Sequence, residues 1–373
     1  MTTAHGGATI YYTTDGSAPT AASNIYTGPF TLTIPPGGSI TLRVTDSATL
    51  GGDGPSDSGT AVYRGYGFKP GDSWYADNDP NPVQGFTGNL IAADGKYYRA
   101  GQWMLGGTDI EAAEGVWLYS TPDLYNWHYE SQILGLPAGW QEVSRPHIVY
   151  NASTQQYVLW AHLIAYNGNP EFPTANAAGI ATAPAITGPW AWVNTNYNPG
   201  HGYKDCNLFE DADGTAYTVA TDGSQQNMWV YRLASDYLSA VAAAQVDATS
   251  GWESPVLFRR GSTYFLITGA SDLYVNTLNN FTNQSYQTAG SPLGPWTAKA
   301  PLFASNPQGT LYNGQPTSVF QIPGKQDGWI YMADNWTGPA VAGSTHLWLP
   351  LTFSDATHAQ VQTPASWDLS YFP

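Results

Sequence analysis

The sequence has almost no cysteine and few charged residues, and both shortages limit what the protein can be. Among 373 residues there is one cysteine, Cys206, so no disulfide can form within the chain and stability has to come from a packed core. Charged residues make up 11% of the chain, and the net charge of −16 repels nucleic acid and anionic membranes. We therefore expect a neutral partner, with no nucleic acid and no membrane bound.

Motifs of several other protein classes are missing as well. No run of about 18 apolar residues occurs, so no segment is expected to span a membrane. The 7 histidines include no close-spaced pair of the kind that binds zinc, and no Gly-x-Ser-x-Gly nucleophile motif is present. We expect no metal and no cofactor. The sequence begins without a signal peptide, and we expect a secreted or periplasmic monomer whose signal peptide is not part of this sequence.

Aromatic residues, glycine and proline are abundant. The chain contains 15 Trp, 25 Tyr, 12 Phe, 40 Gly and 27 Pro. This composition is typical of short strands joined by many turns, so we expect an all-β fold. A flat aromatic ring can also stack on the apolar face of a sugar, although most of these rings are expected to pack strands together.

The first 64 residues differ from the rest and predict a small β-sandwich. Alternating segments at 8–14 and 39–44 indicate strands, and the segment 15–20 between them is a turn. No cluster of catalytic side chains lies here, so a structural spacer is favoured over a sugar-binding module. We therefore predict two domains, at residues 1–64 and 65–373.

Five similar units follow one another in residues 65–373. In each unit a turn residue stands three positions before a tyrosine, and an apolar run lies on either side of that turn, which predicts a hairpin. Five such units predict a five-bladed β-propeller, and a long sandwich or a β-helix is disfavoured because no short repeat is present. The five tyrosines are Tyr98, Tyr157, Tyr217, Tyr264 and Tyr331.

The innermost strands of such a fold begin at one mouth of a central channel, where two carboxylates are expected to converge. These are Asp205 and Glu253, and a concave mouth that gathers carboxylates is a candidate active site. Trp252 can desolvate Glu253, and Asp205 supplies a neighbouring negative charge; both effects raise a carboxyl pKa. We predict Glu253 as a general acid and Asp205 as the residue that tunes and orients it. The alternative is that both only cap exposed strand ends.

The remaining strand starts carry no further carboxylate. Gln315 stands at the fifth, and an amide is not a base at ordinary pH. Glu142 lies two residues before Ser144, on the same face if the strand extends that far, and could reach the mouth together with Ser144 and Arg145. Four tryptophans are candidates for sugar subsites from their places in the units, although a core role is equally compatible with their positions: Trp103, Trp140, Trp229 and Trp336.

Several strings in this order and spacing resemble glycoside hydrolase family 43, and within it the exo-β-1,3-galactanase subgroup. They lie at 120–127, 145–151, 204–217, 252–255, 315 and 331–336, so the resemblance covers the whole of residues 65–373. In the first 64 residues, the strings TIYYTTDGSAPT and YTGPF resemble the chitobiase C-terminal-type module that is often attached to carbohydrate-active enzymes.

The resemblance to the subgroup implies an inverting exo-hydrolase that releases galactose from a β-1,3-linked polysaccharide or oligosaccharide. It implies Glu253 as general acid and Asp205 as its modulator. It also implies that Gln315, which stands where other family members carry the base, holds the attacking water.

Three positions depart from the subgroup pattern. Ser144 stands where a Glu is typical, Phe86-Thr87 where a His-Gly pair is usual, and Asn335 where an Arg is frequent. These departures leave two alternatives open. The chain could bind glycans without hydrolysing them, or it could be a glycosidase that acts on another sugar, such as an arabinofuranoside.

Overall fold

The computed structural model describes residues 1, 3, 5–32, 34, 39–52, 58–64, 66–79, 81–103, 115–166, 173–222, 227–247, 252–270, 284–303, 314–336 and 344–373. The chain divides into two compact units, one made of Met1–Lys69 with Pro364–Tyr371 and the other of Pro70–Thr363 with Phe372–Pro373. Regular structure in the described residues is almost entirely β-strand. The predicted all-β class is therefore confirmed.

The first unit contains one four-stranded antiparallel sheet among its described residues, in the order β2-β1-β3-β4. A short helix follows β3, because the side chain of Asp46 accepts a hydrogen bond from the Thr49 amide and so caps the helix N-terminus. The second sheet of the predicted sandwich stays a prediction. The elements are β1 (Ile10–Thr13), β2 (Asn24–Ile25), β3 (Ser39–Asp46), α1 (Ser47–Gly51), β4 (Ser58–Arg64) and the 3-10 helix η2 (Leu369–Tyr371).

The second unit contains five four-stranded antiparallel sheets in its described residues, each built from four consecutive strands and called here sheets I to V. Sheet I comprises β5 (Leu90–Ala93), β6 (Lys96–Gln102), β7 (Gly115–Thr121) and β8 (His128–Gly135). Sheet II comprises β9 (Glu142–Asn151), β10 (Gln156–Tyr166), β11 (Pro173–Ala183) and β12 (Ala191–Tyr197). Sheet III comprises β13 (Lys204–Glu210), β14 (Ala216–Thr221), β15 (Met228–Leu233) and β16 (Ala240–Asp247). Sheet IV comprises β17 (Trp252–Arg260), β18 (Thr263–Ala270), β19 (Gln284–Ala289) and β20 (Ala300–Pro301), and sheet V comprises β21 (Gly314–Gln321), β22 (Trp329–Asn335), β23 (Thr345–Phe353) and β24 (Ala359–Val361).

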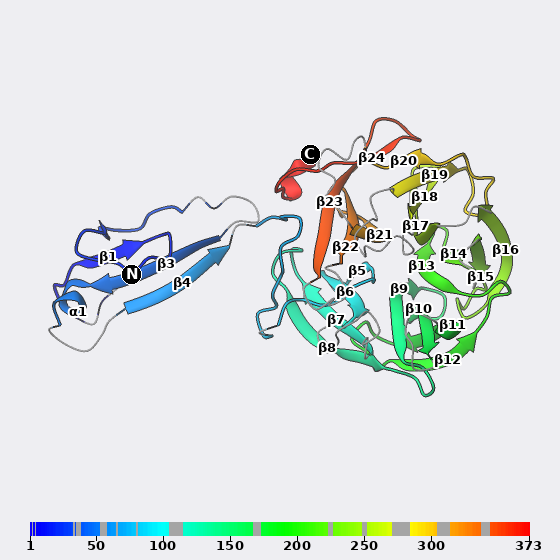
Figure 1. The fold of residues 1–373 in the computed structure, drawn as a ribbon, viewed down its shortest axis with the longest axis horizontal. Helices are drawn as coiled ribbons and strands as arrows, with labels where there is room; N and C mark the ends of the chain where they lie inside the picture. The colour runs from blue at the N-terminus through cyan, green and yellow to red at the C-terminus, as the bar shows by residue number, and fades with distance from the viewer. Residues whose placement is uncertain are drawn as a thin grey trace. The chain divides into compact units, whose positions relative to one another are not determined.

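The five sheets stand around a common centre, with the first strand of each sheet nearest to it (Figure 1). Strand β13 contacts both β9 and β17, and β17 also contacts β21, so these inner strands are neighbours in chain order. Each unit expected from the sequence corresponds to one sheet, and its tyrosine lies in the second strand of the opening hairpin: Tyr98 in β6, Tyr157 in β10, Tyr217 in β14, Tyr264 in β18 and Tyr331 in β22.

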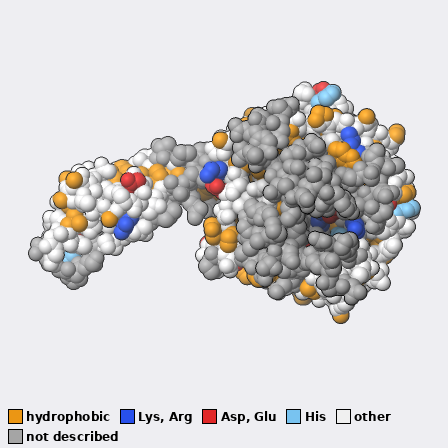
Figure 2. Space-filling model, viewed as in Figure 1, with side chains coloured by type: hydrophobic (Ala, Val, Ile, Leu, Met, Phe, Trp, Pro, Cys, Tyr) orange, Lys and Arg blue, Asp and Glu red, His pale blue; other side chains and the backbone are white. Residues whose placement is uncertain are grey.

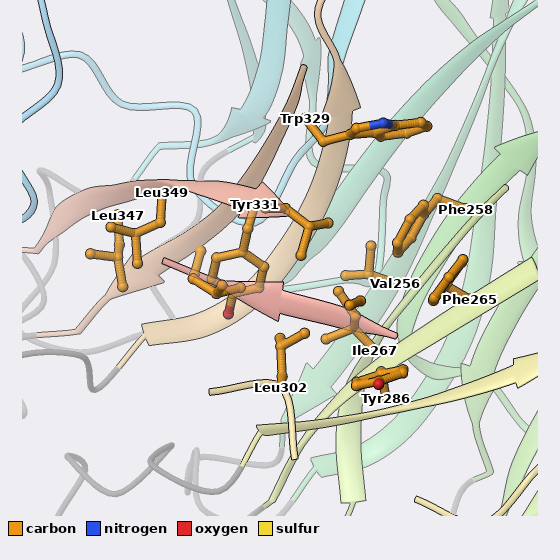
Figure 3. Packing of buried hydrophobic residues seen from close by; sticks show 14 residues of the cluster. Val256, Phe258, Phe265, Ile267, Tyr286, Leu302, Trp329, Tyr331, Leu347 and Leu349 are labelled. Atoms are coloured by element: carbon orange, nitrogen blue, oxygen red, sulfur yellow. The ribbon is translucent and has the colours of Figure 1, made fainter. Parts of the chain in front are cut away.

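Hydrophobic side chains from neighbouring sheets pack against each other. Figure 3 shows the cluster between sheets IV and V, in which Phe265 and Ile267 of β18 share a core with Tyr331 and Leu349. Comparable clusters join sheets I with II, II with III, and III with IV. Burial of each such side chain stabilises the fold by about 1.5–3 kcal/mol. Because these side chains hold neighbouring sheets against each other, they also fix the positions of the inner strands.

The contact between sheets V and I contains a buried polar cluster as well as aromatic packing between Tyr97 and Phe320. Asp334 of β22 accepts from Arg99 Nη2 of β6 at 3.5 Å, from the backbone amide of Thr87 at 2.5 Å, and lies 3.2 Å from Nδ1 of His346. The Arg99 guanidinium also lies 5.5 Å from the centre of the Trp348 ring. Burial lowers the pKa of Arg99 to about 10, which still leaves it charged at neutral pH. A buried ion pair therefore joins the last sheet to the first.

Candidate active site

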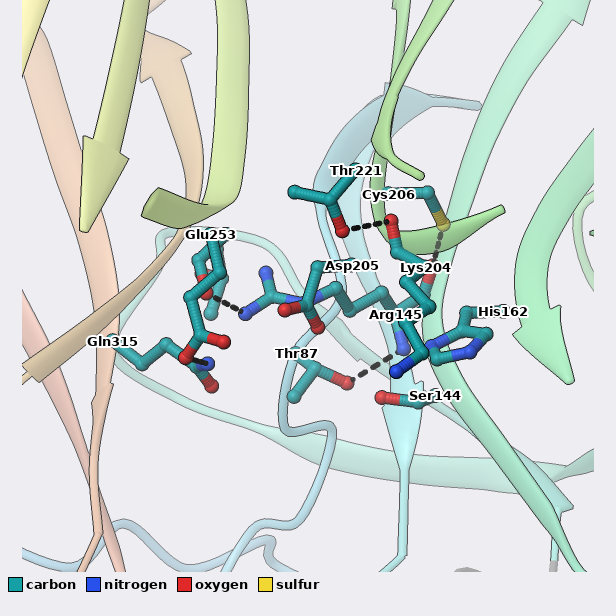
Figure 4. A network of polar contacts seen from close by, with 12 residues as sticks. Thr87, Ser144, Arg145, His162, Lys204, Asp205, Cys206, Thr221, Glu253 and Gln315 are labelled. Carbon is teal, nitrogen blue, oxygen red and sulfur yellow. Dashed lines mark hydrogen bonds and ion pairs between the residues drawn. The ribbon is translucent and has the colours of Figure 1, made fainter. Parts of the chain in front are cut away.

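The inner strands bring the predicted catalytic residues together. Asp205, Glu253 and Gln315 are each the second residue of an inner strand, namely β13, β17 and β21. Arg145 comes from the first half of β9 and lies among them (Figure 4). Acidic and basic side chains are visible near the centre of this face of the second unit (Figure 2). The site is thus assembled from four different sheets.

Irregular backbone at the strand starts aims these side chains. Arg145, Asp205 and Ser254 have left-handed φ values of 50°, 38° and 57°, and the strand registers shift next to each of them. In a regular strand two consecutive side chains point to opposite faces, whereas a bulge lets both reach one side. Glu253 and Ser254 accordingly both face the site. Left-handed backbone at a residue other than glycine costs about 1–3 kcal/mol, and such strain gathers at functional sites.

Arg145 holds the site together through its guanidinium. Its Nε donates to Oδ1 of Asp205 at 3.1 Å, its Nη1 to the carbonyl oxygen of Pro316 at 2.9 Å, and its Nη2 to Oγ of Ser254 at 2.5 Å. The side chain of Arg145 is 1% exposed. One buried cation therefore contacts strands β13, β17 and β21 at once, and the rigid fork of donors in arginine suits this task.

Glu253 and Asp205 occupy different electrostatic environments. Burial raises the pKa of Glu253, and the nearby negative charge of Asp205 raises it further, above the usual range of a glutamic acid. Burial also pushes the pKa of Asp205 upward, but the positive charge of Arg145, the neighbouring His162 and hydrogen bonds from Arg145 and Glu253 together outweigh it and hold that pKa below its ordinary value. At neutral pH Glu253 is the carboxyl that keeps its proton, and Asp205 is the ionised partner.

Gln315 lies between Glu253 and a tryptophan. Its Nε2 donates to Oε1 of Glu253 at 3.2 Å, and its Oε1 accepts from Nε1 of Trp336 at 3.0 Å. Trp336 is 5% exposed and packs against Phe86, with 5.5 Å between the ring centres. The structure therefore places Trp336 behind Gln315, as a buried hydrogen-bond donor.

Ser144 faces a small hydroxyl-rich corner beside Arg145. The hydroxyls of Ser144 and Thr87 both donate to Oε1 of Gln102, and Thr87 Oγ1 accepts from the backbone amide of Arg145 at 3.0 Å. The left-handed φ of Thr87, 62°, marks the same kind of irregular backbone as in the other sheets. Sequence reasoning did not single out Gln102, because it follows no motif and belongs to the second strand of its sheet.

Glu142 and His162 belong to β9 and β10, the paired strands next to this corner. Glu142 is buried at the first position of β9, and its carboxylate accepts from the hydroxyl of Tyr166 at 2.5 Å. His162 of β10 pairs with Ser144 in the strand register, and its Nε2 lies 2.7 Å from Oδ1 of Asn176. Burial lowers the pKa of His162 to about 4, so the ring is neutral at neutral pH. No pattern in the sequence marked His162.

The other three predicted tryptophans have partners of their own. Trp229 of β15 stacks on the ring of His201, with 3.5 Å between ring centres. Trp103 follows Gln102 at the end of β6 and stacks on Trp117, with 5.0 Å between ring centres. Trp140 is partly buried and packs against the hydrophobic cluster between sheets I and II. Their roles as sugar subsites stay predictions.

Two further findings concern ions and membranes. Among the described residues, no group of three or more His, Cys, Asp or Glu side chains is arranged to hold a metal ion. The search for membrane-crossing helices, limited to the same residues, found none that is long and apolar enough.

Comparison with known proteins identifies both parts of the chain. Residues 80–355 match the family model of glycosyl hydrolases family 43. The chain belongs to glycosyl hydrolase family 43. Residues 1–53 match the chitobiase/β-hexosaminidase C-terminal domain, which confirms the resemblance seen in the first 64 residues. No curated protein matches the chain in sequence.

Solved structures of family 43 proteins have a similar fold. A β-1,3-galactosidase of the family is 26% identical with a TM-score of 0.71, and the match covers 82% of this chain and 64% of that one. An exo-β-1,3-galactanase from Clostridium thermocellum is 24% identical with a TM-score of 0.70, covering 80% of this chain and 66% of that one. This chain thus spans less than two thirds of either protein.

A third neighbour was solved with a sugar bound. This exo-β-1,3-galactanase from Phanerochaete chrysosporium, in complex with β-1,3-galactotriose, is 22% identical with a TM-score of 0.70, and the match covers 81% of this chain and 68% of that one. At such identities, the second and third neighbours show the fold alone.

Proposed function

We propose that this family 43 chain is a secreted or periplasmic, inverting exo-β-1,3-galactanase. Its proposed substrate is a β-1,3-linked polysaccharide or oligosaccharide, from which it releases galactose. In this proposal sheets I to V are the blades of a five-bladed β-propeller, the strand starts form its active mouth, and the enzyme works as a monomer. The names of the structural neighbours support the sugar and the linkage. The residues at the mouth support the chemistry.

The observation that carries the proposal is the unequal protonation of two neighbouring carboxyls. Glu253 is buried and keeps its proton at neutral pH, whereas Asp205 is ionised by its pairing with Arg145. Hydrolysis of a glycosidic bond needs one carboxylic acid that is still protonated when the substrate binds. Burial and a neighbouring anion are the two environments that produce such an acid.

Glu253 would give its proton to the glycosidic oxygen as the bond from that oxygen to the anomeric carbon breaks. A water molecule would add to the anomeric carbon from the opposite side and release one proton to solvent, and Glu253 would regain a proton from solvent. Asp205 stays ionised throughout and stabilises the protonated Glu253 before the reaction. Attack from the opposite side inverts the anomeric configuration.

A second candidate function is a glycosidase of different sugar specificity. Ser144 favours it, because its hydroxyl is turned toward Gln102 and a serine offers no carboxylate to sugar hydroxyls at this position. A glycan-binding protein without hydrolytic activity is the remaining alternative. Measuring which sugar is released, and whether any is released, distinguishes these two alternatives from the galactanase.

The test is release of galactose from β-1,3-galactan by the wild type and by Glu253→Gln, with NMR of the first-formed anomer. The proposal expects galactose in the inverted configuration and a rate loss of at least about 10²-fold in the variant. Glu210→Gln is a matched control, because burial also raises the pKa of Glu210 but this carboxyl lies at the far end of β13. Release of another sugar from a panel of glycosides would support the second candidate, and binding without release would overturn hydrolysis.

A further inference from the structure

We infer that Trp336 is a positioning residue, which holds the amide of Gln315 with its oxygen toward the indole and its nitrogen toward Glu253. The inference rests on the proposed hydrolysis and concerns the same site. Trp336 affects the reaction only by orienting the side chain of Gln315.

The direction of the amide follows from the chemistry of indole. The Nε1–H group of tryptophan can only donate, so the atom of Gln315 that lies 3.0 Å from it has to be the amide oxygen. The amide nitrogen then occupies the other position, 3.2 Å from Oε1 of Glu253. Without the indole, the two ends of the amide would be free to exchange places.

The indole itself is held in place. Trp336 is 5% exposed and follows the last residue of β22, which pairs with β21 so that Gln315 lies opposite Asp334. Phe86 packs against the Trp336 ring and also against His346, at 5.5 and 4.6 Å between ring centres. The N–H group of the Trp336 indole is therefore held in place by packing, and it donates to the amide oxygen of the partly exposed Gln315.

Two consequences for the proposed chemistry follow. The oxygen of Gln315 points toward the Trp336 indole, so the amide presents its N–H groups to Glu253. The Oε1 atom of Glu253 accepts a hydrogen bond, which leaves the transferable proton on its other oxygen. The carboxylate of Asp205, the second hydrogen-bonding partner of Glu253, is the acceptor for that proton before the substrate binds.

The test is Trp336→Phe, which keeps an aromatic ring and removes the N–H group. We expect kcat on β-1,3-galactan to fall about ten- to a hundredfold with a smaller change in KM, because a misplaced group near the reacting atoms costs on this order. The basic limb of the pH–rate profile should move to higher pH. The reason is that the hydrogen bond from Gln315 lowers the pKa of Glu253, and a freed amide no longer provides it reliably.

Trp329→Phe is the matched control. Trp329 is the first residue of β22, the strand that ends just before Trp336; it is also 5% exposed, and its indole nitrogen makes no hydrogen bond within the described part of the structure. If Trp336 were only a packing residue, both variants would lower the melting temperature alike and leave the pH profile unchanged, which would overturn the inference.

A double-variant cycle tests whether Trp336 acts through Gln315. In the background of Gln315→Ala, the exchange Trp336→Phe should cause no further loss of kcat, because the group that it positions is already gone. Multiplying losses in the double variant would contradict the inference.

A measurement independent of turnover separates this inference from the proposed function. Carbon-13 NMR of labelled glutamate carboxyls gives the pKa of Glu253 directly, and we expect it to rise by about half a unit or more in Trp336→Phe. If the wild type releases no sugar, the proposed function fails, while a shifted Glu253 titration still supports the positioning role. An unshifted titration in a folded variant overturns that role whatever the activity.

Discussion

Nε of Arg145 lies 3.1 Å from Oδ1 of Asp205, and this ion pair joins strands β9 and β13 of two different sheets. The side chain of Arg145 is 1% exposed and that of Asp205 is 17% exposed, so the two charges are largely withdrawn from water. The pair keeps Asp205 ionised, and ionised Asp205 keeps Glu253 protonated. The protonation state of Glu253 on sheet IV thus depends on Arg145, which belongs to sheet II but reaches the site through its long side chain.

Replacing Asp205 by asparagine should lower the pKa of Glu253. The negative charge of Asp205 raises that pKa in the wild type, so its removal lets Glu253 lose its proton at a lower pH. Because the acid has to be protonated, the basic limb of the kcat/KM profile should move to lower pH and the rate at neutral pH should fall. Asp213→Asn, in the exposed turn after β13, should leave the profile unchanged. A basic limb that stays in place in Asp205→Asn would contradict this account.

Replacing Arg145 by methionine should destabilise the fold strongly. The change leaves the Asp205 carboxylate buried without its cation, and breaking a buried pair in this way costs about 3–5 kcal/mol. Denaturant unfolding measures the loss. Adding Asp205→Asn to Arg145→Met should recover part of it, because the unpaired charge is then removed as well. Purely additive losses in the double variant would show that the ion pair carries little of the effect.

Breaking the buried ion pair between Asp334 and Arg99, which joins sheets V and I, should destabilise the fold as strongly as the loss of Arg145. Asp334→Ala removes the partner of Arg99 and the acceptor of the Thr87 amide, and so leaves a buried cation uncompensated. We expect a loss of about 3–5 kcal/mol in the free energy of unfolding. Asp327→Ala, which removes a more exposed ion pair with Arg260, should cost at most about 1 kcal/mol. Equal losses in the two variants would show that the buried ion pair between sheets V and I contributes no more to stability than an exposed one.

The buried His147 should make the protein less stable in acid. Burial lowers its pKa to about 4 in the folded chain, against about 6.5 when unfolded. Between these values the unfolded state binds a proton that the folded state does not, so the free energy of unfolding decreases as the pH falls from about 6.5 toward 4. Above this window the group has no effect.

His147→Gln tests this pH dependence, since an amide nitrogen does not titrate and can still donate to the carbonyl oxygen of Thr317, which lies 2.9 Å from Nε2 of His147. Urea unfolding at a series of pH values should show a shallower decline for the variant, by up to roughly 3 kcal/mol at the acid end. His358→Gln, on an exposed turn, is the control. Parallel curves for His147→Gln and the wild type would contradict the prediction.

Much of the architecture was predictable because it depends on neighbours in the sequence. The turn before each of the five tyrosines marks a hairpin, and each hairpin opens one sheet. The same spacing placed Asp205, Glu253 and Gln315 near the starts of inner strands, where the structure finds them. Turn chemistry and alternation act over a few residues, so they can be read along the chain.

The details of the site required the tertiary structure. Strict alternation would point Glu253 and Ser254 to opposite faces, and only the left-handed backbone at Ser254 turns both toward Arg145 and Asp205. Nothing in the sequence indicates which residue of a strand takes that conformation, because the packing around a bulge has to compensate its strain.

The sequence by itself determined the all-β class, the five hairpin units and the residues that lie at the inner strand starts. Only the tertiary structure decided that Arg145 binds three strands at once and that the indole of Trp336 faces Gln315 rather than solvent. Periodicity and turns are local properties of the chain. The partner of a buried charge or amide depends on how separate sheets pack against one another, and residues far apart in sequence settle that together.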